Sequence, residues 1–527
     1  MKFSVGMLRL CTLTAFALFL FCSHVASAEE RSIGPIVVYE EGHDTSLPVR
    51  YLASFSLGSG SHKVLPLRRS PFPPTISTAT DPVVQHEILP PVSTTNFGSF
   101  DGIRDVDGAA APDTNVSVGA TQVVEAVNTS YQVFSKSTGK SVFGPAELSS
   151  IWSGFSGTCG LGSGGSFRNP IALYDKAAQR WLITILASSD DFATGTECVA
   201  VSTSSDATGS YNRYAYSYPP NLNDSPKFGV WADAYYASYN MYDGQTFVGA
   251  EACAYDRTSM LSGKTANGVC FLNASDFSLL PSDLDGTTLN APGEPNFFAE
   301  LTPNGASSLS LFQFHVNFAT PSSSTFSGPA KVNVAAFSEA CAGGACIPQP
   351  NGDGTQLESL ADRLMFRLAY RNFSDHEALV VTHSVKGSSA VSNVRWYEIR
   401  SPNTSPTIFQ QGTFAHSNIA LWMASIGMDK AGDIAFGMSG SSRSIHPSIG
   451  YTGRVPTDPL GNMESPAIIN VGKGSQTGGV TSWGEYSSMS IDPSDDCTFW
   501  YAQEYLSSDG SLNWHTRLAA FKFKSCH

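Results

Sequence analysis

Three arginines spaced four residues apart are the first feature of this sequence that suggests chemistry. In a strand over residues 362–372, Arg363, Arg367 and Arg371 would share one face, and a helix would also stack them on one side. A guanidinium binds a carboxylate or sulfate through paired N–H donors. The pattern therefore predicts a clamp for an anionic group of a substrate. In the alternative interpretation, each arginine pairs with a nearby carboxylate such as Asp362 or Asp375.

A polar triplet follows these arginines along the chain. Asp375, His376 and Glu377 are consecutive, and His383 lies one expected strand further on. A histidine beside carboxylates can act as a general base or as a metal ligand. Because adjacent residues of a strand point to opposite faces, the triplet is also compatible with a polar turn between two strands.

Other acidic and phenolic groups lie in aromatic surroundings. A glycosidase needs two carboxyl groups about 5–10 Å apart, whereas a lyase or sialidase-type enzyme would pair a tyrosine with arginines. Tryptophan can stack on a sugar ring, although it also packs in blade cores. The catalytic candidates are Asp233, His376, Glu377, Glu485 and Tyr486. The substrate-binding candidates are Arg363, Arg367, Arg371, Trp231 and Trp422.

An aspartate-rich loop with glycines occupies residues 101–113. Asp105, Asp107 and Asp113 supply hard oxygen donors, and Ca²⁺ takes six to eight oxygens. We expect either a structural Ca²⁺ site here or a network of Asx turns, and no other cofactor. A four-histidine iron centre would need distant histidines to converge, and nothing local demands it: His315, His376, His383 and His416.

The elements that must position these residues are short strands. From about residue 99, apolar, β-branched and aromatic runs alternate with Gly, Asn, Asp and Pro, as in chains with many tight turns. A loose repeat consists of a strand, an aspartate-containing turn and a second strand with aromatic residues. Its clearest copies surround Asp175, Asp429 and Asp492, with a contracted copy at Asp233.

About seven such units of roughly 60 residues predict an all-β fold, a single β-propeller of about seven blades. Radial packing protects the edges that a lone four-stranded sheet would expose. The last alternating strand, residues 517–524, is expected to close the ring by pairing with the first blade. Two β-sandwich domains are the alternative architecture.

The chain divides into three expected parts. Residues 1–28 read as a signal peptide, with basic Lys2 and Arg9, an apolar stretch and a small-residue cleavage site at Ala28. Residues 29–98 are rich in Pro, Ser and Thr and are interpreted as a pro-segment or extended arm, with short strands near 36–39 and 51–57. Residues 99–527 form the propeller.

Cysteine content and charge restrict the compartment and the partners. Eight cysteines follow the expected leader, and the simplest pairing is sequential: 159–198, 253–270, 341–346 and 497–526. The net charge of −14 argues against a general nucleic-acid binder and against a partner for anionic membranes. We expect a secreted monomer, extracellular or periplasmic, with an extracellular carbohydrate as partner.

Four stretches carry a resemblance to known proteins. Residues 227–240, 363–385, 395–400 and 483–505 resemble a family of uncharacterised secreted bacterial proteins, and more distantly the repeat resembles sialidase-like propellers. The first resemblance implies no established reaction. The Ser-x-Asp-x-Gly-x-Thr-Trp box of the sialidase-like enzymes does not occur in this sequence.

Two function classes fit these observations. The first is a secreted hydrolase or lyase that acts on a polysaccharide or other acidic glycan at the mouth of the propeller channel. The alternative is a non-catalytic extracellular propeller that binds glycan or protein. A carboxyl pair with a raised pKa at the channel would favour the enzyme.

Overall fold

The computed structural model describes residues 1, 32–52, 63–64, 67–106, 108–160, 166–189, 191–350, 353–387 and 391–527. The expected signal peptide lies outside the described residues, apart from Met1. Contacts divide the chain into Met1–Arg31 and Ser32–His527, and only the second unit is described below. Among the described residues, no helix is long and apolar enough to cross a membrane.

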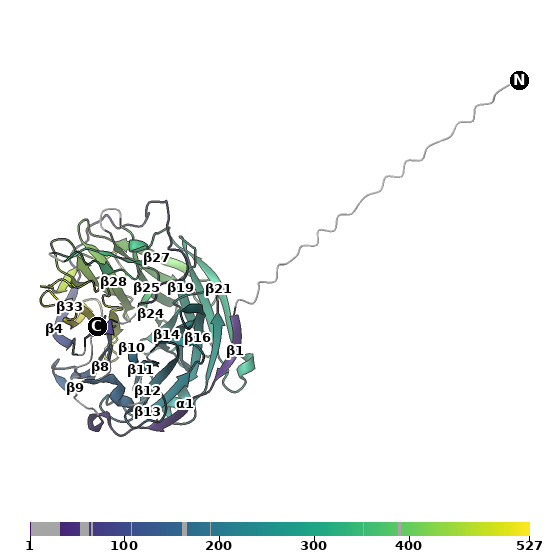
Figure 1. Ribbon diagram of the computed structural model, residues 1–527. Coiled ribbons are helices and arrows are strands. Elements are labelled where there is room, and N and C mark those ends of the chain that lie inside the picture. The colour runs from purple at the N-terminus through teal and green to yellow at the C-terminus, as the bar shows by residue number, and fades with distance from the viewer. Residues whose placement is uncertain are drawn as a thin grey trace. The chain divides into compact units, whose positions relative to one another are not determined.

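Seven four-stranded antiparallel units follow one another around a ring, as the change of colour from blue through teal and green to yellow shows in Figure 1. Blade 1 contains β6 (Asn115–Val118), β7 (Gln122–Val127), β8 (Ser130–Ser135) and β9 (Ser141–Glu147). Blade 2 contains β10 (Ser166–Asp175), β11 (Arg180–Ser188), β12 (Gly195–Ser202) and β13 (Tyr211–Ser217). Blade 3 contains β14 (Leu222–Val230), β15 (Ala234–Asp243), β16 (Thr246–Asp256) and β17 (Gly268–Asn273).

The remaining blades complete the ring. Blade 4 contains β18 (Leu280–Asp285), β19 (Asn296–Leu301), β20 (Ser308–His315) and β21 (Thr325–Asn333). Blade 5 contains β24 (Met365–Asn372), β25 (Glu377–Val385), β26 (Asn393–Arg400) and β27 (Thr407–Phe414). Blade 6 contains β28 (Ala420–Met428), β29 (Ile434–Ser441), β30 (Ser448–Arg454) and β31 (Ala467–Asn470). Blade 7 contains β32 (Ser488–Ile491), β33 (Thr498–Leu506), β34 (Trp514–Phe523) and β4 (Thr94–Arg104).

The remaining elements are short and lie outside the four-stranded repeat. β1 (Ser32–Val38) adds to β17, β2 (Gly42–Thr45) adds to β13, β3 (Lys63–Val64) pairs with β5 (Ala109–Ala110), and β22 (Ala345–Ile347) pairs with β23 (Leu357–Glu358). The helical segments are α1 (Arg257–Leu261) and the 3₁₀ turns Val49–Tyr51, Leu148–Trp152, Pro321–Ser323 and Ala340–Gly343. The chain is therefore an all-β protein, and the alternative of two β-sandwich domains is wrong.

The repeat found in the sequence is the hairpin between the first two strands of a blade. Asp175 ends β10 and accepts the Ala178 N–H at 2.9 Å. Asp429 follows β28 and accepts two backbone N–H groups of its turn in the same way. These carboxylates satisfy backbone donors that the tight turn leaves unpaired.

The core lies between the blades. All nine residues of β28 are buried, and eight of the nine in β11 are buried. Both faces of such a strand are covered by neighbouring blades, so the strand reads as a continuous apolar run rather than an alternating one. The segment Glu358–Tyr370, which the sequence left open between helix and strand, ends in β24.

The ring is closed by an N-terminal strand. β34 pairs with β4 of the same blade, with Leu518 opposite Phe100, and Figure 1 labels β4 and β33 in the same part of the ring. The expected closing role of residues 517–524 is confirmed, but the partner begins at Thr94, before the expected start of the propeller. Of the expected arm strands, β1 covers 32–38, Val49–Tyr51 is a 3₁₀ turn, and residues 53–57 lie outside the described part of the chain.

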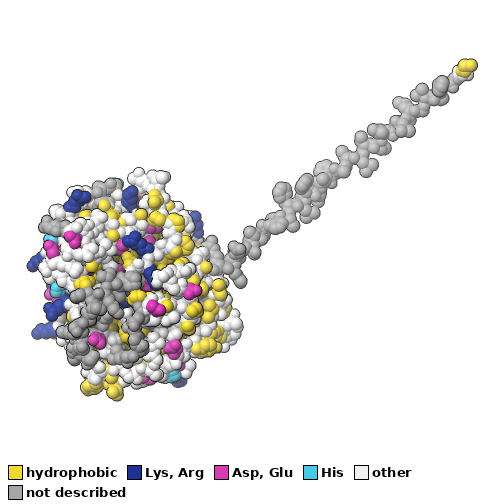
Figure 2. Space-filling model, in the orientation of Figure 1, with side chains coloured by type: hydrophobic (Ala, Val, Ile, Leu, Met, Phe, Trp, Pro, Cys, Tyr) yellow, Lys and Arg dark blue, Asp and Glu magenta, His cyan; other side chains and the backbone are white. Residues whose placement is uncertain are grey.

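The four predicted disulfides are confirmed. Cys159–Cys198, Cys253–Cys270, Cys341–Cys346 and Cys497–Cys526 are bonded in sequential pairs. This content is typical of proteins that fold in an oxidising compartment. On the face drawn in Figure 2, the coloured basic and acidic side chains are interspersed rather than gathered by sign.

Candidate functional site

The first strands of the blades begin at the same end of the ring. β18 and β24 pair in parallel, with Ser282 opposite Leu368, so the inner strands of blades 4 and 5 run in one direction. Side chains near the beginnings of the inner strands of blades 2, 3, 5 and 7 line one small pocket. Four blades can meet only near the axis, so this pocket, which we call the mouth, lies where the inner strands begin.

Each blade has one non-glycine residue with a left-handed backbone at or just before the beginning of its inner strand. Their φ angles lie between 46° and 57°, and the residues are Asp113, Asn169, Ser225, Ser278, Leu360, Met423 and Glu485. Pairing with the second strand shifts register beside three of them, in β10, β14 and β28. A left-handed residue at a bulge turns the strand and redirects its side chains. The seven positions thus form a structural repeat, and four of them, Asn169, Ser225, Leu360 and Glu485, line the mouth.

Buried ion pairs fill the mouth. Arg168 Nη2 lies 3.2 Å from Asp224 Oδ1, and Arg363 Nε lies 2.7 Å from Asp362 Oδ1. The Lys227 ammonium lies 4.2 Å from the centre of the Tyr486 ring. All of these side chains are almost wholly buried. The mouth therefore keeps several charges out of water, an arrangement that costs stability unless the charges are paired or used.

Glu485, which lines the mouth, and Asp113, which lies beside it, both hold protons more tightly than usual. The Asp113 N–H donates to the Gly484 carbonyl at 2.8 Å, which brings Asp113 beside the segment that carries Glu485. Burial, followed by the charge of Asp113, raises the pKa of Glu485 to about 7. Burial also raises the pKa of Asp113 to about 6. Both carboxyl groups therefore hold a proton to a higher pH than an exposed carboxyl group does.

Several polar atoms of the mouth have no hydrogen-bond partner within the described part of the protein. They include Asp113 Oδ1, Arg168 Nε and Glu485 Oε1. The space between the lining side chains is about 20 Å³, enough for a water molecule. Buried polar atoms are nearly always satisfied, so unsatisfied atoms gathered in one pocket indicate a place for water or ligand.

The three arginines that the sequence groups together do not form one clamp. Arg363 is at the mouth, whereas Arg367 pairs with Asp283 at 3.0 Å and with Asp285, and also donates to the Met489 carbonyl. Arg367 therefore joins the inner strands of three blades along the axis.

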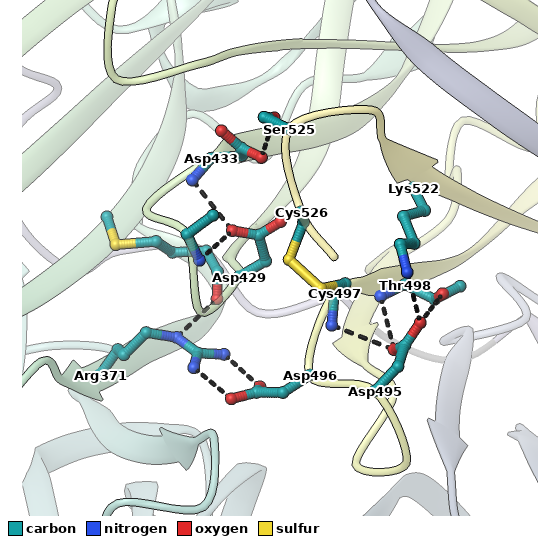
Figure 3. The surroundings of a disulfide bond; sticks show 12 residues. Arg371, Asp429, Asp433, Asp495, Asp496, Cys497, Thr498, Lys522, Ser525 and Cys526 are labelled. Atoms are coloured by element: carbon teal, nitrogen blue, oxygen red, sulfur yellow. Dashed lines mark hydrogen bonds and ion pairs between the residues drawn. A yellow bond between two sulfur atoms is a disulfide. The ribbon is translucent and has the colours of Figure 1, made fainter.

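Arg371 lies at the opposite end. Its guanidinium binds both oxygens of Asp496 at 2.7 and 2.8 Å, and its Nε donates to the Met428 carbonyl, as drawn in Figure 3. Arg363 and Arg371 are eight positions apart, about 26 Å at the rise of an extended strand. The alternative interpretation, in which each arginine pairs with a carboxylate, describes all three.

Other predicted residues also lie at the opposite end. Trp231 lines a cavity of about 340 Å³ there, together with Tyr174 and Lys176, although its own side chain is buried. Asp233, in the same turn as Trp231, is exposed and accepts from Tyr236. These residues cannot act on a substrate held at the mouth.

Glu377 begins β25, the second strand of blade 5, and His376 directly precedes it. The Tyr370 hydroxyl donates to Glu377 at 2.9 Å and also lies 3.2 Å from Glu294 Oε2. Burial, followed by the contact with Glu377, raises the pKa of Glu294 to about 8. Because the phenol contacts both carboxyl groups, it takes the place that a substrate would need. His376 pairs with Asp375 at 2.8 Å on a turn, as the alternative interpretation of the triplet expects.

Glu485 and Tyr486 are the predicted catalytic residues that lie at the mouth with Arg363. Trp422 is fully buried against Trp483, with ring centres 6.0 Å apart, so its ring is not free to stack on a sugar.

Two of the aspartates predicted to bind calcium, Asp105 and Asp113, accept hydrogen bonds from other protein groups. Asp105 accepts the Gly108 N–H at 2.8 Å, Asp113 accepts from Asn169, and Asp107 lies outside the described residues. Among the described residues, the two groups of side chains close enough to share an ion both contain disulfide cysteines, and neither includes Asp105, Asp113 or a histidine. The calcium site stays a prediction.

The sequence analysis missed Arg168, Asp224 and Lys227, and it assigned Asp113 to a metal. A local signal marks two of these strands: Arg168-Asn169-Pro170 and Asp224-Ser225-Pro226 each place a charged residue and a left-handed residue before proline. Asparagine tolerates the left-handed conformation better than most residues. The same pattern at Arg400-Ser401-Pro402 and Glu464-Ser465-Pro466 falls outside the residues that line the mouth, so it does not identify the mouth by itself.

Comparison with known proteins found similar solved structures at low sequence identity and low TM-score. A scan against protein-family models found no match, and a search of curated proteins found none. Among solved structures, the GH93 α-L-arabinofuranosidase of Fusarium graminearum is 7% identical, with a TM-score of 0.38 over 80% of this chain and 97% of that chain. The exo-β-1,3-galactanase of Phanerochaete chrysosporium is 10% identical, with a TM-score of 0.30 over 81% and 99%. The Trypanosoma rangeli sialidase is 11% identical, with a TM-score of 0.35 over 68% and 55%.

Proposed function

We propose that this chain is a secreted, monomeric glycoside hydrolase that cleaves a polysaccharide at the mouth of its propeller. The observation that carries the proposal is the pair Asp113 and Glu485. Asp113 and Glu485 are the left-handed residues of two different blades. The pKa of Asp113 is raised to about 6 and that of Glu485 to about 7. Acid hydrolysis of a glycosidic bond needs one carboxylic acid and one carboxylate.

In this proposal, Glu485 donates a proton to the leaving oxygen of the glycosidic bond, because burial and the charge of Asp113 both favour its protonated form. Asp113 stays ionised and supports the attacking water or the developing positive charge of the sugar. Arg168 has an unpaired Nε that can bind an oxygen of the substrate. Arg363 is already paired with Asp362, so its charge is not free for a substrate. Binding of an acidic glycan would therefore rely on the unpaired donor of Arg168.

The test is a panel of neutral and acidic polysaccharides assayed for new reducing ends. Leu67 and Arg68 of the N-terminal arm line the mouth and could keep a polymer out. The full chain is therefore assayed both intact and after a protease has cut the peptide bond between Arg69 and Ser70. Glu485→Gln should lower kcat about 10²–10⁴-fold. The matched control Glu377→Gln, at the opposite end, should change kcat less than about threefold, since its carboxyl group is far from the mouth. Equal losses in both variants would place the reaction elsewhere.

A non-catalytic binding propeller is the second candidate. It is favoured by the ion pair between Arg363 and Asp362 and by the small volume of the mouth. It predicts that a polysaccharide binds without any release of reducing ends, and that Glu485→Gln leaves its Kd unchanged.

A further inference from the structure

The N-terminal arm crosses the mouth. Leu67 and Arg68 are among the residues that line it, although they lie far in sequence from every blade residue around them. Residues 67–70 are called the plug from here on. They link the arm to Asp224 of blade 3 and to charged residues of the segment that precedes β24 of blade 5.

Arg68 uses both its backbone and its side chain. Its carbonyl accepts an N–H of Arg363 Nη2 at 2.8 Å. Its guanidinium lies 3.8 Å from Asp224 Oδ2 and 4.1 Å from the centre of the Tyr242 ring. Arg68 thus occupies the Arg363 guanidinium and the Asp224 carboxylate, two groups that a ligand at the mouth could bind.

Arg69 and Ser70 complete the plug. Arg69 Nη2 lies 2.7 Å from Glu358 Oε2, and the Glu358 side chain is fully buried. The Ser70 N–H donates to Asp362 Oδ2 at 2.8 Å. A buried carboxylate that loses its ion-pair partner becomes costly unless water reaches it. Departure of the plug should therefore open the mouth to solvent.

We propose that the plug holds the mouth closed and that hydrolysis of the peptide bond between Arg69 and Ser70 opens it. This inference rests on the proposed function, because it describes the regulation of the same site. An external protease that recognises paired basic residues adds one water across the bond. Arg69 then ends in a carboxylate and Ser70 begins with an α-ammonium group.

The sequence offers one place for such a cut. Arg68 and Arg69 are the only two adjacent basic residues in the chain, and the residue after them is serine rather than proline. The Arg69 side chain is 53% exposed, so a protease can reach it. β1, β2 and β3 stay paired with β17, β13 and β5, which anchors the arm as far as Val64 after the cut, so only the short new chain end at Arg69 can leave.

The new ammonium group favours the open form. The Ser70 nitrogen already lies 2.8 Å from Asp362, and the cut converts it from a neutral amide into a cation at neutral pH. It then competes with Arg363 for Asp362. Arg363, which also loses the carbonyl of Arg68, becomes available to a ligand.

The experiment measures release of the plug separately from activity. The full chain, intact or cut by a protease specific for paired basic residues, is labelled with a water-soluble carbodiimide and an amine, and labelled carboxyl groups are quantified by peptide mass spectrometry. The cut should speed the labelling of Glu358 at least about tenfold, because water reaches the exposed carboxylate. Glu398, buried in the third strand of blade 5 and paired with Arg400, should label equally slowly in both forms. Arg69→Gln in the full chain should resist the protease and show no increase after treatment.

The outcomes separate the two proposals. Faster Glu358 labelling together with a clear rise in kcat/KM on a polysaccharide supports both. Faster labelling without any polysaccharide cleavage supports the plug and contradicts the hydrolase. Complete cutting with unchanged Glu358 labelling overturns the plug, whatever the activity.

Discussion

At the scale of single residues, the molecule buries many arginines, aspartates and glutamates. Arg367 and Arg371 are paired along the axis, and carboxyl groups such as Glu197 are enclosed by neighbouring strands. The sequence predicted that Arg363, Arg367 and Arg371 share one face of a strand or of a helix; β24 carries Arg367 and Arg371, and Arg363 precedes it. The sequence could not predict their different levels along the axis, because each level is set by partners such as Asp283 and Asp496 from other blades.

Glu197 on β12 should make stability depend on pH. Burial raises its pKa to about 8, and Asn223 is a hydrogen-bond partner at 3.3 Å. A carboxyl group whose pKa is raised on folding binds its proton more tightly in the native state. Its stabilising effect is therefore complete below pH about 4 and is lost as the pH rises through about 8.

Glu197→Gln should remove this dependence. Between about pH 5 and pH 9, the free energy of unfolding of the native sequence should fall more than that of the variant, by on the order of 3 kcal/mol. Urea unfolding at the two pH values measures the difference. The exposed Glu87→Gln is the control and should keep the slope of the native sequence. Identical slopes for Glu197→Gln and the native sequence would show that Glu197 is ionised in the folded protein.

At the scale of elements, the inner strand with its left-handed residue is the unit that builds the mouth. The sequence predicted the turn at the far end of this strand, because an aspartate such as Asp175 or Asp429 caps its own hairpin. It did not predict the near end, since residues as different as Asp113, Leu360 and Met423 adopt the same conformation there. That conformation is imposed by packing between blades rather than by the local sequence.

Ser225 offers a test of this element. Its φ of 57° disfavours a β-branched side chain, so Ser225→Val should lower the free energy of unfolding by about 1–3 kcal/mol. Ser225→Gly should change it by less than about 1 kcal/mol, because glycine adopts this conformation readily. Urea unfolding compares both with Ser327→Val, an exposed position of β21. If Ser225→Val and Ser327→Val lower the free energy of unfolding equally, the left-handed repeat is not imposed by the fold.

At the scale of the whole molecule, closure of the ring joins the two ends of the propeller. The seven units and the sequential disulfides were predictable, because both arise from residues close in sequence. The identity of the closing partner was not, since β4 and β34 are distant in sequence and the arm gives no local signal for their pairing. The same arm supplies the plug, so residues 32–104 serve the fold and the mouth together.

The Cys497–Cys526 disulfide should hold this closure. It fastens the chain end after β34 to the turn before β33, beside the Arg371–Asp496 pair in Figure 3. Loop-closure entropy for its separation of 29 residues corresponds to about 3–4 kcal/mol, against about 2 kcal/mol for the separation of 5 in Cys341–Cys346.

Replacing Cys497 and Cys526 by alanine should therefore lower the free energy of unfolding more than the same change at Cys341 and Cys346. Denaturant unfolding measures both, and hydrogen exchange should rise first in β4 and β34. A larger loss for the Cys341–Cys346 pair would show that closure does not depend on the C-terminal disulfide.

The central claim, that the mouth is the functional site, is tested most directly by a crystal structure with a bound sugar. Crystals of the cut chain carrying Glu485→Gln would be soaked with oligosaccharides from the polymers of the panel. The account predicts a sugar within hydrogen-bond distance of Arg168 and residue 485, on the side of the ring where the inner strands begin. A sugar bound instead in the 340 Å³ cavity beside Trp231, with the mouth empty, would contradict it.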